Sequence, residues 1–224
     1  MHKVKVIFFD VGNTLLFPNR TKILAPLACE SRPTLEQWRA LERKTKVEFD
    51  RGMQDGRVDH SFWQTFHALM LDEFNRKDPR RQDLLVELVR NTRSSANWDQ
   101  ILPATRETLD RIATRYRIAV ISNSDGGIDK VLSRCGIADC FEAITDSGNV
   151  GFEKPRREIF DAALRALKAQ PTESLYVGDL YSVDYLGATN AGMQAVLFDV
   201  AGAYQTRQEA RVRSLQELER WLEQ

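Results

Sequence analysis

Asp10 stands at the end of a short apolar run in the segment FFDVGNTLL, which covers residues 8–16. A carboxylate at such a place can act as a nucleophile or as a ligand for a hard cation. Gly12 follows two residues later, and Thr14 adds a hydroxyl four residues later. A single acidic residue at a strand end is more often a turn residue, so other groups must accompany it to support a chemical role.

Further polar residues stand at the ends of later apolar runs or just before a helical pattern. They are Ser122, Asn123, Lys154, Asp179 and Asp184. Parallel sheets bind ligands beyond the carboxyl ends of their strands, so we expect these side chains to converge on one edge of a sheet. Three carboxylates gathered there would repel one another unless a cation lay among them, and oxygen ligands suit Mg²⁺. Lys154 and the Ser122 hydroxyl suit an anion held against that metal.

The elements that must position these residues alternate between strand and helix. Short β-branched and apolar runs predict strands at 4–11, 117–124, 142–145, 175–179 and 195–200. Amphipathic patterns predict helices at 105–116, 126–136, 155–168, 182–192 and 214–223. This alternation predicts an α/β fold, a Rossmann-like doubly wound parallel sheet with helices on both faces.

The segment from 18 to 100 breaks this alternation because it contains no convincing strand. Amphipathic patterns at 34–51, 59–76 and 81–93 predict long helices instead. The sequence therefore predicts an all-helical insertion between the first strand and the rest of the α/β domain.

Four motifs in order give the chain a resemblance to a known family. They are DVGNT at 10–14, VISNS at 120–124, GFEKP at 151–155 and GDLYSVD at 178–184, the last followed by GATNAGM at 187–193. The chain resembles a haloacid dehalogenase superfamily hydrolase of subfamily I, with a helical C1 cap, over essentially its whole length. The resemblance implies a core domain of residues 1–17 and 101–224 and a cap domain of residues 18–100.

The resemblance also implies a role for each matched residue. Asp10 would be the nucleophile, Thr14 a supporting hydroxyl, and Lys154 a catalytic and phosphate-binding cation. The Ser122 hydroxyl would be catalytic and would bind phosphate. Asn123 would also contact phosphate. The implied cofactor is Mg²⁺, at 2.0–2.1 Å from its ligands. Those ligands would be Asp10, the Gly12 carbonyl, Asp179 and Asp184, the last directly or through water.

Gly12 is where the sequence departs from the phosphatases of this family. Their second Asp protonates the leaving group and then helps to activate water, while its backbone carbonyl binds the metal. Gly12 keeps the carbonyl and lacks the acid, whose catalysis typically contributes about 10²–10⁴-fold in rate. Asn13 cannot replace it because an amide does not titrate. A glycine also permits a positive φ, which would strain an Asp placed there.

The leading interpretation is a Mg²⁺-dependent phosphohydrolase that acts on a small phosphorylated metabolite through an aspartyl-phosphate. A haloacid dehalogenase is an alternative because that chemistry needs no proton on the leaving halide. A phosphonate hydrolase is another and would require a cap lysine, for which Lys44 and Lys46 are weak candidates. A non-catalytic protein that binds phosphate metabolites or a partner is the interpretation from a different class.

The composition limits the classes of molecule that the protein is expected to bind. The chain has 224 residues with 32 basic and 32 acidic side chains, so no global charge favours nucleic acid or anionic lipid. The basic run RQEARVR at 207–213 is interpreted as a solvated helix face. No apolar run approaches the ~20 residues of a membrane span. Three cysteines do not suggest a disulfide framework. We expect a cytoplasmic monomer or homodimer that binds neither nucleic acid nor membrane.

Overall fold

A six-stranded parallel sheet forms the centre of the computed structural model, which describes residues 3–29, 32–54, 62–74 and 77–224. The strand order is β5-β4-β1-β6-β7-β8, so the chain winds outward from β1 in one direction and then returns to wind in the other. The strands are β1 (Val6–Phe9), β4 (Arg117–Ser122), β5 (Ile144–Asp146), β6 (Ser174–Gly178), β7 (Gln194–Phe198) and β8 (Arg211–Val212). The predicted doubly wound sheet is confirmed.

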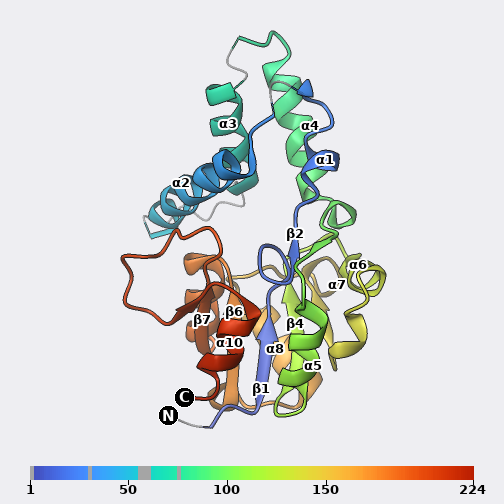
Figure 1. Ribbon diagram of the computed structural model, residues 1–224. Helices are drawn as coiled ribbons and strands as arrows, with labels where there is room; N and C mark the ends of the chain where they lie inside the picture. The colour runs from blue at the N-terminus through green and yellow to red at the C-terminus, as the bar shows by residue number, and fades with distance from the viewer. Residues whose placement is uncertain (1–2, 30–31, 55–61, 75–76) are drawn as a thin grey trace.

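Helices cover both faces of the sheet (Figure 1). They are α5 (Thr105–Ala113), α6 (Ile128–Arg134), α7 (Ser147–Val150), α8 (Arg157–Leu167), α9 (Leu186–Asn190) and α10 (Leu215–Trp221). Short turns of 3-10 helix are η2 (Ser95–Asn97), η3 (Ala138–Cys140) and η4 (Pro171–Glu173), and η5 (Tyr181–Tyr185) is π-helical. Consecutive residues of β1 enter different cores: Phe9 packs with residues of α5, α6 and α10, and Phe8 with residues of α8 and α9. This alternation explains why β1 reads as a continuous apolar run.

A helical segment, α1–α4, stands over the carboxyl ends of the strands (Figure 1). It consists of α1 (Arg20–Ile23), α2 (Leu35–Gln54), α3 (Phe62–Phe74) and α4 (Arg81–Arg93). Trp38, Phe66 and Leu88 belong to its own apolar core. The helix predicted at 59–76 is present as α3, and residues 59–61 and 75–76 lie outside the described residues. Within the described chain, no helix combines the length and the apolar character needed to cross a membrane.

Two short strands join the helical segment to the sheet domain. β2 (Leu16–Phe17) pairs antiparallel with β3 (Gln100–Ile101), with Leu16 opposite Ile101 and Phe17 opposite Gln100. The sequence analysis did not predict this pair, because two residues are too few to show a periodicity. The pair lies at residues 17 and 101, where the domain boundaries are predicted. The division into two domains stays a prediction.

The element type predicted for the segment 207–213 is wrong. Instead of a helix, the segment contains β8, which pairs in parallel with β7 and forms one edge of the sheet. The N–H groups of Leu197 and Asp199 donate to the carbonyls of Ala210 and Val212, at 2.9 and 2.8 Å. Long-range pairing to a sheet edge overrides the local helical propensity of a charged run.

Candidate active site

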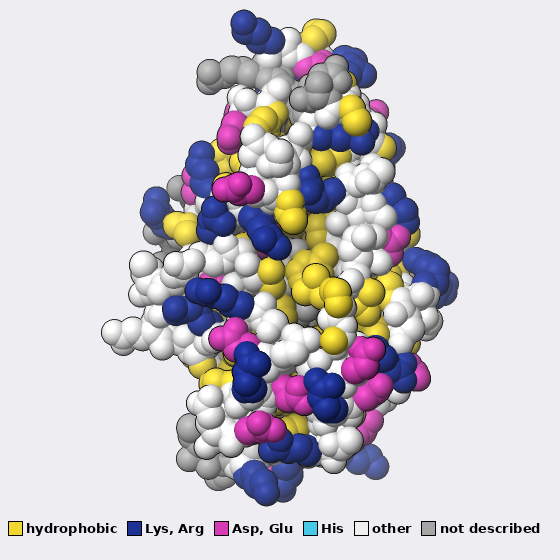
Figure 2. Space-filling model, in the orientation of Figure 1, with side chains coloured by type: hydrophobic (Ala, Val, Ile, Leu, Met, Phe, Trp, Pro, Cys, Tyr) yellow, Lys and Arg dark blue, Asp and Glu magenta, His cyan; other side chains and the backbone are white. Residues whose placement is uncertain are grey.

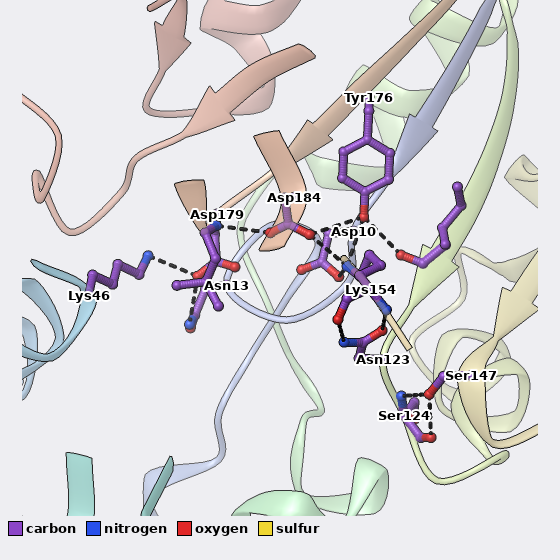
Figure 3. Close-up of polar contacts among 12 residues, drawn as sticks. Asp10, Asn13, Lys46, Asn123, Ser124, Ser147, Lys154, Tyr176, Asp179 and Asp184 are labelled. Carbon is purple, nitrogen blue, oxygen red and sulfur yellow. Dashed lines mark hydrogen bonds and ion pairs between the residues drawn. The ribbon is translucent and has the colours of Figure 1, made fainter. Parts of the chain in front are cut away.

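Three aspartates meet at the carboxyl ends of β1 and β6, directly below the helical segment. Asp10 follows β1, Asp179 follows β6, and Asp184 lies in the π-helical turn η5 (Figure 3). One carboxylate oxygen from each lies within 4.8 Å of the others, and all three residues are buried. We call this group the acidic cluster. The convergence of Asp10, Asp179 and Asp184 follows from β1 and β6 being adjacent parallel strands.

Lys154 closes one side of the acidic cluster. Its ammonium group donates to Asp10 Oδ1 at 2.6 Å, to Asp184 Oδ1 at 2.8 Å and to the Tyr176 hydroxyl at 2.8 Å. These three bonds use all three of its protons. Asn123 fixes the lysine's backbone from the end of β4, because its amide donates to the Lys154 carbonyl and accepts from the Lys154 N–H at 3.0 and 2.8 Å. Asn123 therefore positions Lys154, and its predicted phosphate contact remains a prediction.

Gly178 allows Asp184 to reach the acidic cluster. A Cβ on Gly178 would lie 2.5 Å from Cγ of Asp184, which is closer than carbon atoms can approach. Asp184 is further fixed by the Leu180 N–H, which donates to its Oδ2 at 2.9 Å. Both carboxylate oxygens thus have protein partners, an arrangement that suits a metal contact through water.

Lys46 reaches the acidic cluster from α2, in the helical segment. Its ammonium lies 2.8 Å from Asp179 Oδ2 and 3.0 Å from Glu42 Oε1, and only 1% of its side chain is exposed. The sequence analysis gave this lysine little weight. Glu42, Lys46 and Asp50 form an i, i+4 row of buried charges on α2. That row was the available signal, but a sequence does not show which charged face of a helix turns inward.

Asp50 makes a second contact between α2 and the sheet domain. Its Oδ1 accepts from the N–H and the hydroxyl of Ser182 at 3.0 and 2.6 Å, and its Oδ2 accepts from the Tyr204 hydroxyl at 2.8 Å. Ser182 belongs to η5, the turn that carries Asp184. In this structure α2 is therefore bonded to both sides of the turn that completes the acidic cluster.

Burial changes the proton affinities of these groups. It raises the pKa of Asp10, and the opposing effect of Lys154 is only partial because Asp184 and Asp179 raise that pKa further. Burial likewise raises the pKa of Asp179 against the opposing effect of Lys46. Burial alone would lower the pKa of Lys46, but Asp179 and Glu42 outweigh it and raise that pKa well above the ordinary value. The nearby lysines therefore do not fully compensate the negative charge of the acidic cluster.

The charge and chemistry of the cluster fit a divalent metal ion. Four carboxylates, those of the acidic cluster and of Glu42, face the two ammonium groups of Lys46 and Lys154. Two negative charges are left when all are ionised, which one Mg²⁺ would neutralise. Carboxylate oxygens are the ligands that Mg²⁺ prefers.

The remaining predicted site residues lie around the same place. Ser122 ends β4, is buried and lines the cavity above the cluster, as does Gly12. Thr14 is buried as well, and its hydroxyl has no hydrogen-bond partner among the described residues. Asn13, rather than Gly12, adopts a positive φ, of 54°, and its amide donates to Asp179 Oδ2 at 3.2 Å. The possibility of a positive φ at Gly12 is therefore wrong, because Asn13 makes the turn.

A cavity of about 540 Å³ lies between the acidic cluster and the helical segment. This volume is within the ordinary range of about 300–1,000 Å³ for small-molecule sites. Its floor includes Asp10, Ser122 and Lys154, whereas its upper lining is mostly apolar. Figure 2 shows hydrophobic side chains gathered across the middle of the molecule, between the helical segment and the sheet domain.

Replacing Lys46 by methionine is expected to destabilise the metal-free protein and to increase its response to Mg²⁺. Removing one partner of a buried ion pair leaves its carboxylates uncompensated, at a cost of about 3 kcal/mol. A bound cation would offset that loss, so Mg²⁺ should raise the melting temperature more in the variant than in the wild type. Lys44 is exposed on the same helix, so Lys44→Met should behave like the wild type. An equal Mg²⁺-induced shift in Lys46→Met and the wild type would contradict this electrostatic account.

Known proteins are similar to this chain in sequence. A family model for haloacid dehalogenase-like hydrolases matches residues 4–192. A glyceraldehyde 3-phosphate phosphatase of Methanothermobacter thermautotrophicus is 32% identical over 206 residues, which are 87% of this chain and 85% of that protein. Haloacid dehalogenase-like hydrolase domain-containing protein 3 of Homo sapiens is 30% identical over 152 residues, 65% of this chain and 59% of that protein.

Solved structures show the same fold. The HAD-hydrolase YfnB from Bacillus subtilis, whose crystal structure is bound to magnesium, superposes with a TM-score of 0.70 and 18% identity, over 98% of this chain and 99% of that one. At that identity the likeness concerns the fold alone, whereas the family model and the archaeal phosphatase concern the sequence. The predicted family is therefore confirmed: the chain belongs to the haloacid dehalogenase-like hydrolases and is a hydrolytic enzyme.

Proposed function

We propose that this hydrolase is a Mg²⁺-dependent phosphohydrolase that acts on a small phosphorylated metabolite through an aspartyl-phosphate. The observation that carries the proposal is the acidic cluster with Lys154 bonded into it, at the floor of a cavity of small-molecule size. The relatives named glyceraldehyde 3-phosphate phosphatases support a phosphate ester as the substrate.

In this mechanism Asp10 attacks phosphorus and the ester oxygen leaves. Lys154, after exchanging one of its present hydrogen bonds, and the Ser122 hydroxyl bind the phosphoryl oxygens, while Asn123 keeps Lys154 in place through its backbone. The Gly12 carbonyl, Asp10, Asp179 and Asp184 would hold Mg²⁺, which when bound neutralises charge on the phosphoryl group. Water then hydrolyses the aspartyl-phosphate and regenerates Asp10.

We further propose that residues 18–100 act as a cap over a core domain of residues 1–17 and 101–224. The contacts of Lys46 and Asp50 support a closed position in which α2 excludes water from the acidic cluster. A cytoplasmic location and a monomeric or homodimeric state stay predictions.

The position of Lys46 also bears on the phosphonate-hydrolase alternative. A lysine from the helical segment does reach the site, as that chemistry requires, whereas Lys44 is exposed. However, Lys46 lies between two carboxylates, which keep it an ammonium ion, and a Schiff base requires the neutral amine. A dehalogenase is disfavoured because that chemistry needs no Mg²⁺, and without the metal the acidic cluster would repel an anionic haloacid. A non-catalytic protein would have little physical reason to keep the cluster.

The test is hydrolysis of a panel of phosphorylated metabolites, including glyceraldehyde 3-phosphate, with Mg²⁺ and again with EDTA. A 2-haloacid and a phosphonate serve as controls. We expect phosphate release with Mg²⁺, its loss in EDTA and its recovery when Mg²⁺ is restored. Release of halide, or turnover that EDTA does not affect, would contradict the proposed function.

A further inference from the structure

A continuous wall of aromatic rings lines the cavity above the nucleophile. Trp98, Trp63, Phe62 and Phe49 all belong to the cavity lining. Successive rings meet edge to face, with centroids 5.3 Å apart for Trp98 and Trp63, 4.9 Å for Trp63 and Phe62, and 5.5 Å for Phe62 and Phe49. The wall begins after α4 and continues through α3 to α2, so it belongs to the helical part of the cavity lining.

Trp98 fills the space beside Gly12 from which a side-chain acid would act. A Cβ built on Gly12 lies 3.4 Å from Cζ3 of the indole, and its three nearest atoms all belong to that ring. The indole is held in place because its Nε1–H donates to the Thr92 carbonyl at 2.7 Å. A leaving group at this position therefore meets an apolar ring instead of a proton donor.

Two polar groups beside the wall, the Thr92 hydroxyl and the Asp125 carboxylate, are already bonded within the protein. The Thr92 hydroxyl donates to the Leu88 carbonyl at 2.8 Å and lies 2.6 Å from Nε2 of His67. The Asp125 carboxylate accepts from the backbone N–H groups of Ser95 and Gly127 at 3.1 and 3.2 Å. Partial burial alone would raise the pKa of Asp125, but these bonds outweigh it and lower that pKa, so Asp125 stays ionised. Asp125 is thus a poor replacement for the missing acid.

We propose that the preferred substrates are phosphate monoesters of aromatic alcohols, with a phenol as leaving group stacked against Trp98 and Trp63. This inference rests on the proposed function and names its substrate class. Asp10 forms a bond to phosphorus as the bond from phosphorus to the phenolic oxygen breaks. The phenolic oxygen keeps the electron pair, leaves as phenolate and takes a proton from water. A phenol, with a pKa near the value of about 10 for tyrosine, leaves without an enzymic acid far more readily than an alkoxide.

Four esters separate the two parts of this proposal. Phenyl phosphate has a ring and a good leaving group, benzyl phosphate a ring and a poor one, acetyl phosphate a good leaving group without a ring, and a triose phosphate neither. We expect kcat to be higher for phenyl and acetyl phosphate, and KM to be lower for phenyl and benzyl phosphate. A triose phosphate turned over as efficiently as phenyl phosphate would overturn the proposal.

Binding measured without turnover tests the aromatic wall directly. By titration calorimetry with Mg²⁺ present, phenylphosphonate should bind at least about tenfold more tightly than methylphosphonate, a ratio equal to about 1.4 kcal/mol. Trp63→Leu keeps the site apolar and should remove most of that ratio. Val86→Ala, at an exposed apolar position on α4, is the matched control and should keep it. Equal affinities of the wild type for the two phosphonates would overturn recognition of the ring.

The phosphohydrolase function and the aromatic substrate class are overturned by different results. If none of the four esters is hydrolysed with Mg²⁺, the phosphohydrolase function is wrong and so is the part of this proposal that concerns the leaving group. Recognition of the ring would then still be decided by the two phosphonates. If all four are hydrolysed at rates independent of ring and leaving group, the phosphohydrolase function holds and the aromatic substrate class is wrong.

Discussion

Asp10→Asn is expected to abolish ester hydrolysis while the chain stays folded. The substitution removes the nucleophilic carboxylate but nearly keeps the shape, and an amide oxygen can still accept from Lys154, which now lies 2.6 Å from Asp10 Oδ1. Loss of an enzymic nucleophile costs on the order of 10⁴–10⁶-fold in kcat. The expected result is therefore a fall in kcat of on the order of 10⁴-fold or more.

The measurement is phosphate release under saturating Mg²⁺, with circular dichroism to show that the variant is folded. Asp83→Asn, at an exposed position on α4, is the matched control and should keep full activity. Turnover by Asp10→Asn at the wild-type rate would rule out the covalent route, because no aspartyl-phosphate could then form at this residue.

Gly12→Asp is expected to speed the hydrolysis of esters with poor leaving groups. The new carboxyl group restores the general acid, which is worth at most the ~10²–10⁴-fold that such catalysis typically supplies. Gly12 does not have a positive φ, so the backbone accepts a side chain. The Trp98 ring lies 3.4 Å from the new Cβ and limits the directions in which the rest of the Asp can point. We therefore expect a larger gain when Gly12→Asp is combined with Trp98→Leu.

A series of esters graded by leaving-group pKa gives the measurement. The rate of the wild type should fall steeply as the leaving group becomes more basic, and the dependence should flatten in Gly12→Asp. Gly12→Ala adds the Cβ without the acid and is the control for crowding of Trp98. Equal wild-type rates across the series would show that another residue supplies the proton.

The sequence was sufficient to place the acidic cluster and Lys154 because these residues are tied to strand ends. In a parallel sheet the direction of each strand is known once its crossover helix is recognised, so the strand end nearest a ligand follows from the chain order. Asp10, Ser122 and Asp179 each end a readable apolar run, and the structure brings all three to one cavity. At these positions the local sequence pattern is enough to predict where the side chain lies in the fold.

Lys46 and Trp98 could not be placed from the sequence, because their positions depend on how the helical segment packs on the sheet domain. Lys46 approaches Asp179 across 133 positions of the chain, and the Trp98 ring lies beside Gly12 with its indole nitrogen bonded to the Thr92 carbonyl. Tyr176 was missed for another reason, because in the sequence it looks like one more apolar strand residue. Only the fold shows that its hydroxyl accepts a hydrogen bond from the Lys154 ammonium. Such contacts join elements far apart in the chain and leave no periodic signal.

The β2–β3 pair makes the helical segment exchangeable. Because Phe17 is opposite Gln100, the chain leaves the sheet domain and returns to it at neighbouring points. A foreign domain whose ends are similarly close can replace residues 18–99 without stretching β1 or altering the order of the parallel strands. The aromatic residues at 49, 62, 63 and 98 would be lost with the exchanged segment, whereas Lys154 and the three aspartates lie outside it and would be kept. Chimeras built at these two junctions should therefore inherit the chemistry of one parent and the selectivity of the other.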